Sequence, residues 1–322
     1  DPLWSRGLGD VYKRQGIGGL ETIYNGSLTV NERGPKRLSP FFIPSSLVNL
    51  LSGQISIKYG FKGPNHSVVT ACATGAHSIG DSSEMIKRGA ADVMIAGGAE
   101  AAVCKLGIAG FCAARSLSTS YNSTPDQASR PWDKDRDGFV LSEGSGMLVL
   151  EEFEHAKKRS AKIYAEIIGY GLTGDAYHPT APASDGSGGF RAMKMALNNA
   201  KISSDQIDYI NAHGTSTPLG DEIEFNAVKK IFENNKKNLF MSSTKSSTGH
   251  LLGASGAIES IFSILSLKDG VIPPTLNLTN PSSDCEGINL VPKESINNTN
   301  NFSLSNSFGF GGTNVSLIFK KK

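Results

Sequence analysis

Long hydrophobic runs, an excess of charge of one sign and closely spaced cysteines are all missing from this chain of 322 residues. Its apolar stretches are interrupted by Gly, Ser or Lys well short of the ~18 residues that a membrane span needs, so we expect no membrane insertion. The 32 basic and 30 acidic residues leave a net charge of +2, which gives no indication of a nucleic-acid partner. The four cysteines lie far apart, without a C-x-x-C or a paired-histidine spacing, so we expect no disulfide framework, no metal site and a reducing compartment, with the cytoplasm as the default location. They are Cys72, Cys104, Cys112 and Cys285.

What the chain does contain is a glycine-rich alternation of strands and helices, with 36 glycines and 39% hydrophobic residues. This alternation predicts a layered α/β fold. Residues 1–15 differ from the remainder of the chain and show neither an amphipathic nor a signal-peptide pattern, so we expect them to be a non-native scar. A charged segment that ends at Ala161 is the predicted boundary between two halves, residues 16–158 and 162–322.

Periodicity predicts individual elements. Leu47, Leu51, Ile55 and Tyr59 recur every four residues and stop at Gly60, which predicts a helix with its apolar stripe in the core. Near the other end, two β-patterned runs flank the segment 309–312, which predicts a hairpin. Between these regions we predict strands at 92–96, 147–150, 163–170, 207–210 and 239–241, and helices at about 73–89, 190–200, 221–232 and 254–268.

A candidate nucleophile is Cys72 in Thr-Ala-Cys-Ala-Thr-Gly-Ala-His (70–77). A β-branched run, 68–70, gives way at the thiol to a small-residue helix start, so we expect a strand before Cys72 and the sulfur at a helix N-terminus. Unpaired N–H groups and the helix dipole at that position would lower the pKa of the thiol below its usual value. The alternative is that Cys72 is a small buried hydrophobe.

Two histidines follow predicted strands in short Gly/Ser/Thr loops: His213 in 211–217 and His250 in 244–250. Both can reach the sheet edge where Cys72 lies. One thiol and two histidines without a carboxylate partner differ from a protease triad, and two neutral imidazoles would offer two N–H donors to one developing oxyanion. Lys245 could hold a carboxylate or act on His250, or it could be a solvated surface lysine. A structural role remains the default for the other histidines: His66, His77, His155 and His178.

Gly309-Phe310-Gly311-Gly312 joins two strands and opens no helix, so a nucleotide site is not expected there. Its N–H groups could complete an oxyanion hole with the amide of Cys72, and Phe310 could gate the thiol. A plain hairpin turn with a core phenylalanine is the alternative.

Together these motifs resemble the β-ketoacyl-[acyl-carrier-protein] synthases of the thiolase-like superfamily, in particular the type II enzymes of bacterial fatty-acid synthesis. The resemblance covers about residues 16–320. It rests on segments 16–19, 70–75, 130–133, 137–140, 174–178, 211–217, 244–250 and 306–314. It implies a thiolase-like, layered α-β-α-β-α fold of two similar halves.

The resemblance also implies a Cys-His-His site without a cofactor. Cys72 would carry the acyl chain, while His213 and His250 would bind the malonyl thioester, promote loss of carbon dioxide and stabilise the enolate that attacks acyl-Cys72. Supporting roles fall to Lys245, Glu259 and Phe310, and substrate contacts to Thr215, Thr217 and Phe308.

The implied reaction is a decarboxylative Claisen condensation of acyl- and malonyl-acyl-carrier protein in fatty-acid elongation, carried out by a homodimer. A polyketide ketosynthase or a type I elongating synthase remains an alternative. A silent chain-length subunit and a thiol hydrolase are less consistent with the three site residues. The family also carries an N-terminal segment, with the first strand of a central sheet, in place of residues 1–15. We therefore expect the chain as given to fold poorly.

Overall fold

The computed structural model describes residues 17–235 and 238–322, so the predicted scar at 1–15 lies outside the described residues. None of the described helices is long and apolar enough to cross a membrane. The helices are α2 (Leu20–Arg33), α3 (Phe42–Ser46), α4 (Leu50–Tyr59), α5 (Thr74–Lys87), α6 (Lys105–Ala113), α7 (Phe153–Lys158), α8 (Ser187–Ala200), α9 (Pro218–Ile231), α10 (Lys245–Thr248) and α11 (Ser255–Asp269). The strands are β1 (Val93–Glu100), β2 (Gly144–Glu151), β3 (Ala165–Gly174), β4 (Tyr209–Asn211), β5 (Phe240–Ser242), β6 (Val271–Ile272), β7 (Ile296–Asn297), β8 (Phe302–Gly309) and β9 (Thr313–Lys321).

The larger sheet has five strands in the order β3-β9-β8-β4-β5. β9 runs antiparallel to both β3 and β8, whereas β4 is parallel to β8 and β5. α8 packs on β3 and β9 and also contacts α9, and a hydrophobic cluster that includes Phe225, Met193 and Leu304 fills this side of the sheet. The predicted hairpin at 302–319 is confirmed as β8 and β9.

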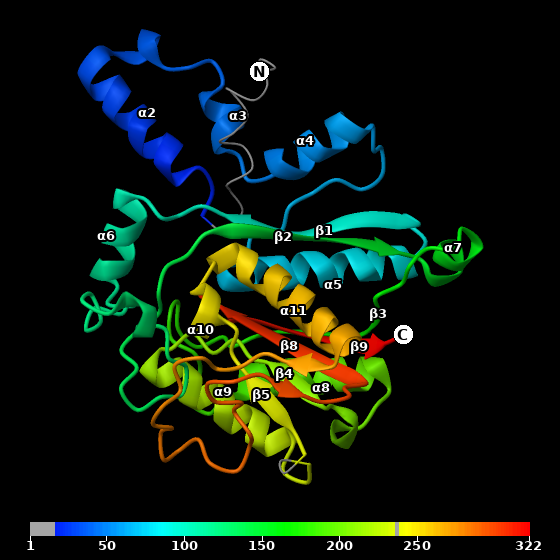
Figure 1. Cartoon of the computed structure of the whole chain (residues 1–322). Coiled ribbons are helices and arrows are strands. Elements are labelled where there is room, and N and C mark those ends of the chain that lie inside the picture. Colours follow the sequence, from blue (N-terminus) through cyan, green and yellow to red (C-terminus); the bar gives the residue numbers. More distant parts are fainter. Residues whose placement is uncertain (1–16, 236–237) are drawn as a thin grey trace.

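The smaller sheet is the antiparallel pair β1–β2, with Val93 opposite Glu151 and Glu100 opposite Gly144. α5 and α11 lie between the two sheets, and α2, α3 and α4 lie on the outer side of β1–β2 (Figure 1). The layers are therefore α-β-α-β-α, and the predicted thiolase-like architecture is confirmed.

The two central helices are built alike. Each follows a 3₁₀ turn, Ala71–Ala73 or Leu252–Ala254, whose first residue has a left-handed φ of 49° or 48°. A Cβ on Gly75 of α5 would lie 2.7 Å from the backbone N of Ala257, and a Cβ on Gly256 of α11 would lie 2.8 Å from that of Ala76. Only glycine permits this approach, which joins the two halves at equivalent points of their helices.

Two local predictions are wrong. Residues 68–70 form no strand, because no neighbouring strand pairs with them in the part of the chain that the structure describes. α4 ends at Gly60 in a left-handed conformation, as predicted, but it begins at Leu50, and of its supposed core stripe only Leu51 is buried. Leu47 and Tyr59 are exposed because α4 lies on the outer side of the two-stranded sheet (Figure 1).

Candidate active site

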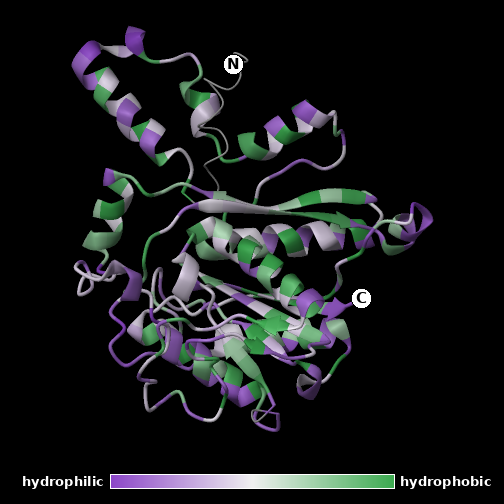
Figure 2. Ribbon diagram, in the orientation of Figure 1, coloured by the Kyte–Doolittle hydropathy of each residue, from purple (hydrophilic) through white to green (hydrophobic). Residues whose placement is uncertain are grey.

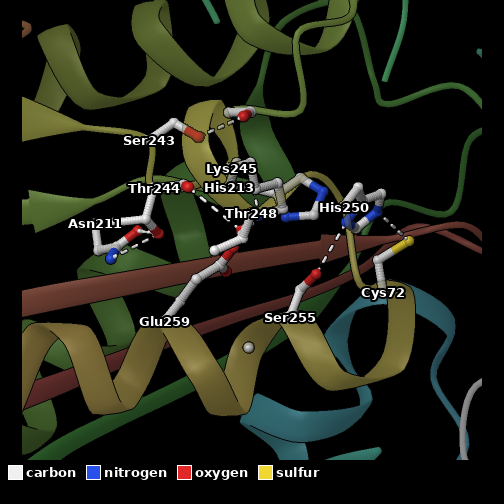
Figure 3. A network of polar contacts seen from close by, with 12 residues as sticks. Cys72, Asn211, His213, Ser243, Thr244, Lys245, Thr248, His250, Ser255 and Glu259 are labelled. Carbon is white, nitrogen blue, oxygen red and sulfur yellow. Dashed lines mark hydrogen bonds and ion pairs between the residues drawn. The ribbon is translucent and has the colours of Figure 1, made fainter. Parts of the chain in front are cut away.

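Cys72 lies in the 3₁₀ turn directly ahead of α5. Ala71, directly before it, has a left-handed backbone conformation, which residues with a Cβ adopt rarely. The chain therefore changes direction sharply at the thiol. The sulfur lies 3.0 Å from Nε2 of His250 (Figure 3). A residue of the first half thus meets one of the second half.

The thiol is not acidified. Burial raises the pKa of Cys72 to about 12, although the charge of Lys245 and the backbone N–H groups of Phe310 and Cys72 act in the opposite direction. The sulfur packs in an apolar cluster with Ala102, Phe139 and Leu252. The predicted lowering of the pKa is therefore wrong, because desolvation outweighs the helix terminus.

His213 follows β4 as predicted, whereas the short helix α10 separates β5 from His250. The two imidazole rings are nearly perpendicular, with centroids 5.4 Å apart, and Phe139 packs edge-on to His250 at 5.1 Å. Burial, followed by the charge of Lys245, lowers the pKa of both histidines well below the usual value. Both rings are therefore neutral near pH 7. Within the described residues, no carboxylate is hydrogen-bonded to either ring.

Lys245 is fully buried, so its interpretation as a surface lysine is wrong. Its Nζ donates to the carbonyl oxygen of His213 at 2.6 Å and forms an ion pair with Glu259 of α11 (Figure 3). Burial raises the pKa of Glu259, and the attraction of Lys245 opposes this shift. The pair ties the His213 loop to the helix that follows His250.

Two contacts of the histidines were not predicted. The carboxylate of Glu224 in α9 accepts the backbone N–H groups of His213 (2.9 Å) and Gly214 (2.8 Å), and also a bond from Nδ2 of Asn306 (3.1 Å). The hydroxyl of Ser255 lies 2.9 Å from Nδ1 of His250. Neither residue stands in a motif, and only the three-dimensional packing brings them to the histidine loops.

Cys72, His213 and His250 line one cavity of about 330 Å³. Thr215 and Thr217, whose hydroxyls lie 3.0 Å apart, line it too. So do Phe308 and Phe310, the latter 38% exposed in the turn between β8 and β9. Lys245 and Glu259 lie behind the histidines, buried away from the cavity. All nine predicted site residues therefore lie in or directly behind one region of the structure.

Comparison with known proteins decides the family. Residues 14–156 match the model of the β-ketoacyl synthase N-terminal domain, and residues 164–279 match that of the β-ketoacyl synthase C-terminal domain. The chain belongs to the β-ketoacyl synthase family. It is an acyltransferase of this class, and the resemblance found in the motifs is confirmed.

Several members of the β-ketoacyl synthase family are highly similar to it. A protein of Rhizobium meliloti named 3-oxoacyl-[acyl-carrier-protein] synthase 2 is 57% identical over 95% of this chain and 72% of its own length. One of the same name from Vibrio cholerae is 54% identical over 95% of this chain and 74% of its own length. Among solved structures, a β-ketoacyl synthase from Burkholderia phymatum has a TM-score of 0.90 at 37% identity, covering 97% of this chain and 74% of that one. A type II polyketide ketosynthase in complex with its acyl-carrier protein has a TM-score of 0.93 at 33% identity, covering 97% and 77%.

Proposed function

We propose that this protein condenses acyl- and malonyl-acyl-carrier protein to 3-oxoacyl-acyl-carrier protein, carbon dioxide and free carrier protein, in fatty-acid elongation. The observation that carries the proposal is the meeting of Cys72 and two neutral histidines in one cavity. The choice of fatty-acid elongation rests on relatives that are 50–57% identical and named 3-oxoacyl-[acyl-carrier-protein] synthase 2. The polyketide ketosynthase among the similar structures is only 33% identical.

The first step is transfer of the acyl group to Cys72. The sulfur attacks the thioester carbonyl, a new carbon–sulfur bond forms, and the thiol of the carrier arm leaves with the proton that Cys72 loses. The N–H groups of Phe310 and Cys72 and the charge of Lys245 stabilise negative charge near the sulfur. Because the pKa of the resting thiol is raised, Cys72 must lose its proton during this step.

The second and third steps use the histidines. The carbonyl oxygen of the malonyl thioester accepts hydrogen bonds from the neutral rings of His213 and His250. The carbon–carbon bond to the carboxylate breaks and carbon dioxide leaves. The electron pair of the broken bond delocalises onto the thioester oxygen, which gives an enolate. The enolate carbon then attacks the acyl-Cys72 carbonyl, the new carbon–carbon bond forms, the carbon–sulfur bond breaks, and the released thiolate of Cys72 takes a proton from solvent. Each oriented donor in such a dry site contributes ~3–4 kcal/mol.

The other predicted residues support these steps. Lys245 and Glu259 hold the His213 loop against α11, so that the two rings keep their mutual angle. Thr215 and Thr217 present hydroxyls to the arm of the carrier, and Phe308 packs beside His213 with ring centroids 5.8 Å apart. Phe310, in the turn at the cavity, gates access to the thiol.

The proposal includes an acyl-carrier protein as partner, a homodimer as the assembly and the cytoplasm as the location. A solved ketosynthase in complex with its acyl-carrier protein supports the first of these. The four cysteines are all free, which suits a reducing compartment.

The test is a reconstitution with acyl- and malonyl-carrier proteins. A 3-oxoacyl product supports the proposal, free fatty acid indicates a hydrolase, and no reaction indicates a silent subunit. Preference for poly-β-keto over saturated acyl chains would move the protein to a polyketide pathway. Cys72→Ala should lower condensation by roughly 10³-fold or more, because no other group can carry the acyl chain. Full activity in this variant would overturn the mechanism.

A further inference from the structure

The imidazole of His250 is held at both nitrogens. Nε2 lies 3.0 Å from the sulfur of Cys72, and Nδ1 lies 2.9 Å from the hydroxyl of Ser255 (Figure 3). Ser255 is therefore one ring away from the nucleophile without touching it. We propose that Ser255 is a positioning residue that fixes the tautomer of His250, with the proton on Nε2. Its consequence for catalysis rests on the proposed function.

The direction of the Ser255–His250 bond is inferred by comparing Ser255 with two other serines of α11. Ser260 and Ser263 donate to backbone carbonyls one turn back, the oxygens of Gly256 (2.6 Å) and Glu259 (2.8 Å). Ser255 is also fully buried, but within the described residues its hydroxyl bonds to His250 Nδ1 alone. A buried O–H without an acceptor is costly, so the hydroxyl donates to Nδ1.

The bond from Ser255 determines which ring nitrogen of His250 carries the proton. An Nδ1 that accepts a hydrogen bond carries no hydrogen, and a neutral imidazole then has its hydrogen on Nε2. That N–H points to the sulfur and to the cavity, where a thioester oxygen becomes negative. With the opposite tautomer, Nε2 would be an acceptor and would repel the oxyanion. Ser255 thus keeps His250 a donor throughout the reaction.

The two histidines differ in this respect. Nδ1 of His213 is buried and has no hydrogen-bond partner among the described residues. Its tautomer is set by no bond at that nitrogen, whereas that of His250 is set by Ser255. The pair therefore consists of one ring with a fixed proton and one ring whose proton position can follow the substrate.

The direct test is nitrogen NMR of protein labelled at its histidines, with the His250 signals assigned by their loss in His250→Asn. We expect the wild type to have a protonated Nε2 and a non-protonated Nδ1 on His250. In Ser255→Ala the two tautomers should mix. Ser260→Ala is the matched control, because it removes a buried hydroxyl of the same helix that bonds only to the backbone, and it should retain the wild-type pattern.

Kinetics give the second readout. Ser255→Ala should lower kcat for condensation about tenfold, the effect of one poorly oriented hydrogen bond, with KM for the carrier proteins unchanged. Ser260→Ala should retain kcat. A wild-type His250 protonated on Nδ1, or equal effects of the two substitutions on tautomer and kcat, would overturn the proposal. If the wild type catalyses no condensation, the proposed function fails, while the NMR result still decides the tautomer.

Discussion

At the scale of single residues, the ion pair of Lys245 and Glu259 is the contact of the site whose loss should destabilise the protein most. Both side chains are almost wholly buried, so each charge depends on the other for its solvation. Lys245→Met should destabilise the protein by about 3–5 kcal/mol, because it leaves the Glu259 carboxylate and the His213 carbonyl without their donor. Urea unfolding measures the loss. The control is Lys268→Met at the exposed end of α11, where the pair with Asp269 should contribute less than about 1 kcal/mol. Equal losses in the two variants would contradict this view of the pair.

The buried histidines predict how stability depends on pH. Burial lowers the pKa of His250 in the folded protein, whereas the unfolded chain has the usual value near 6.5. Below that pH the unfolded state binds more protons than the folded one, so the contribution of His250 to the free energy of unfolding is present above pH 6.5 and is lost as the pH falls through the folded pKa. The free energy of unfolding should therefore fall less between pH 7 and pH 5 in His250→Asn than in the wild type. An equal fall in the wild type and in His250→Asn would contradict this prediction.

At the scale of secondary-structure elements, the crossing of α5 and α11 sets the separation of Cys72 and His250. A methyl group at Gly75 would lie 2.7 Å from the backbone of α11, and no flexible side chain stands there to give way. Gly75→Ala should destabilise by about 1–3 kcal/mol and lower condensation activity, since the helices must move apart.

The matched control for this crossing is Gly110→Ala in α6. Nothing lies within 4 Å of a Cβ at Gly110, so this substitution should be neutral or stabilising by ~0.5–1 kcal/mol. Thermal unfolding and condensation rates of both variants check the prediction. A Gly75→Ala protein as stable as Gly110→Ala would show that the helices can yield without cost.

At the scale of the whole molecule, the end of β1–β2 near α7 carries exposed apolar side chains. Val149 is 65% exposed and Val93 44%, and Figure 2 shows this hydrophobic part of the sheet near α7. Exposed apolar strands favour association. The protein should therefore associate as its concentration rises, and Val149→Lys should weaken this in sedimentation velocity experiments. Met195→Lys, on the surface of α8, should not, and an equal effect of both would place the contact elsewhere.

The sequence predicted the site better than it predicted the environment of the site. Cys72, His213 and His250 stand in motifs, and the structure brings all three together, although only His213 directly follows a strand as predicted. The pKa of Cys72 could not be predicted, because it depends on Phe139 and Leu252, which approach from distant parts of the chain. The exposed stripe of α4 and the unpaired segment 68–70 were mispredicted for a similar reason. Periodicity shows which face of an element is apolar, but not which neighbour covers it.

The position of β9 in the larger sheet affects the order in which the protein can fold. Among the described strands β9 is synthesised last, yet it lies between β3 and β8, and its partners in β3 precede it by about 150 residues. The segment between β3 and β9 must therefore be synthesised before these two strands can pair and before the Phe310 turn can reach Cys72. Contacts between such distant residues form slowly. The Phe310 turn, whose N–H group lies at the thiol of Cys72, should therefore be among the last parts of the active site to form.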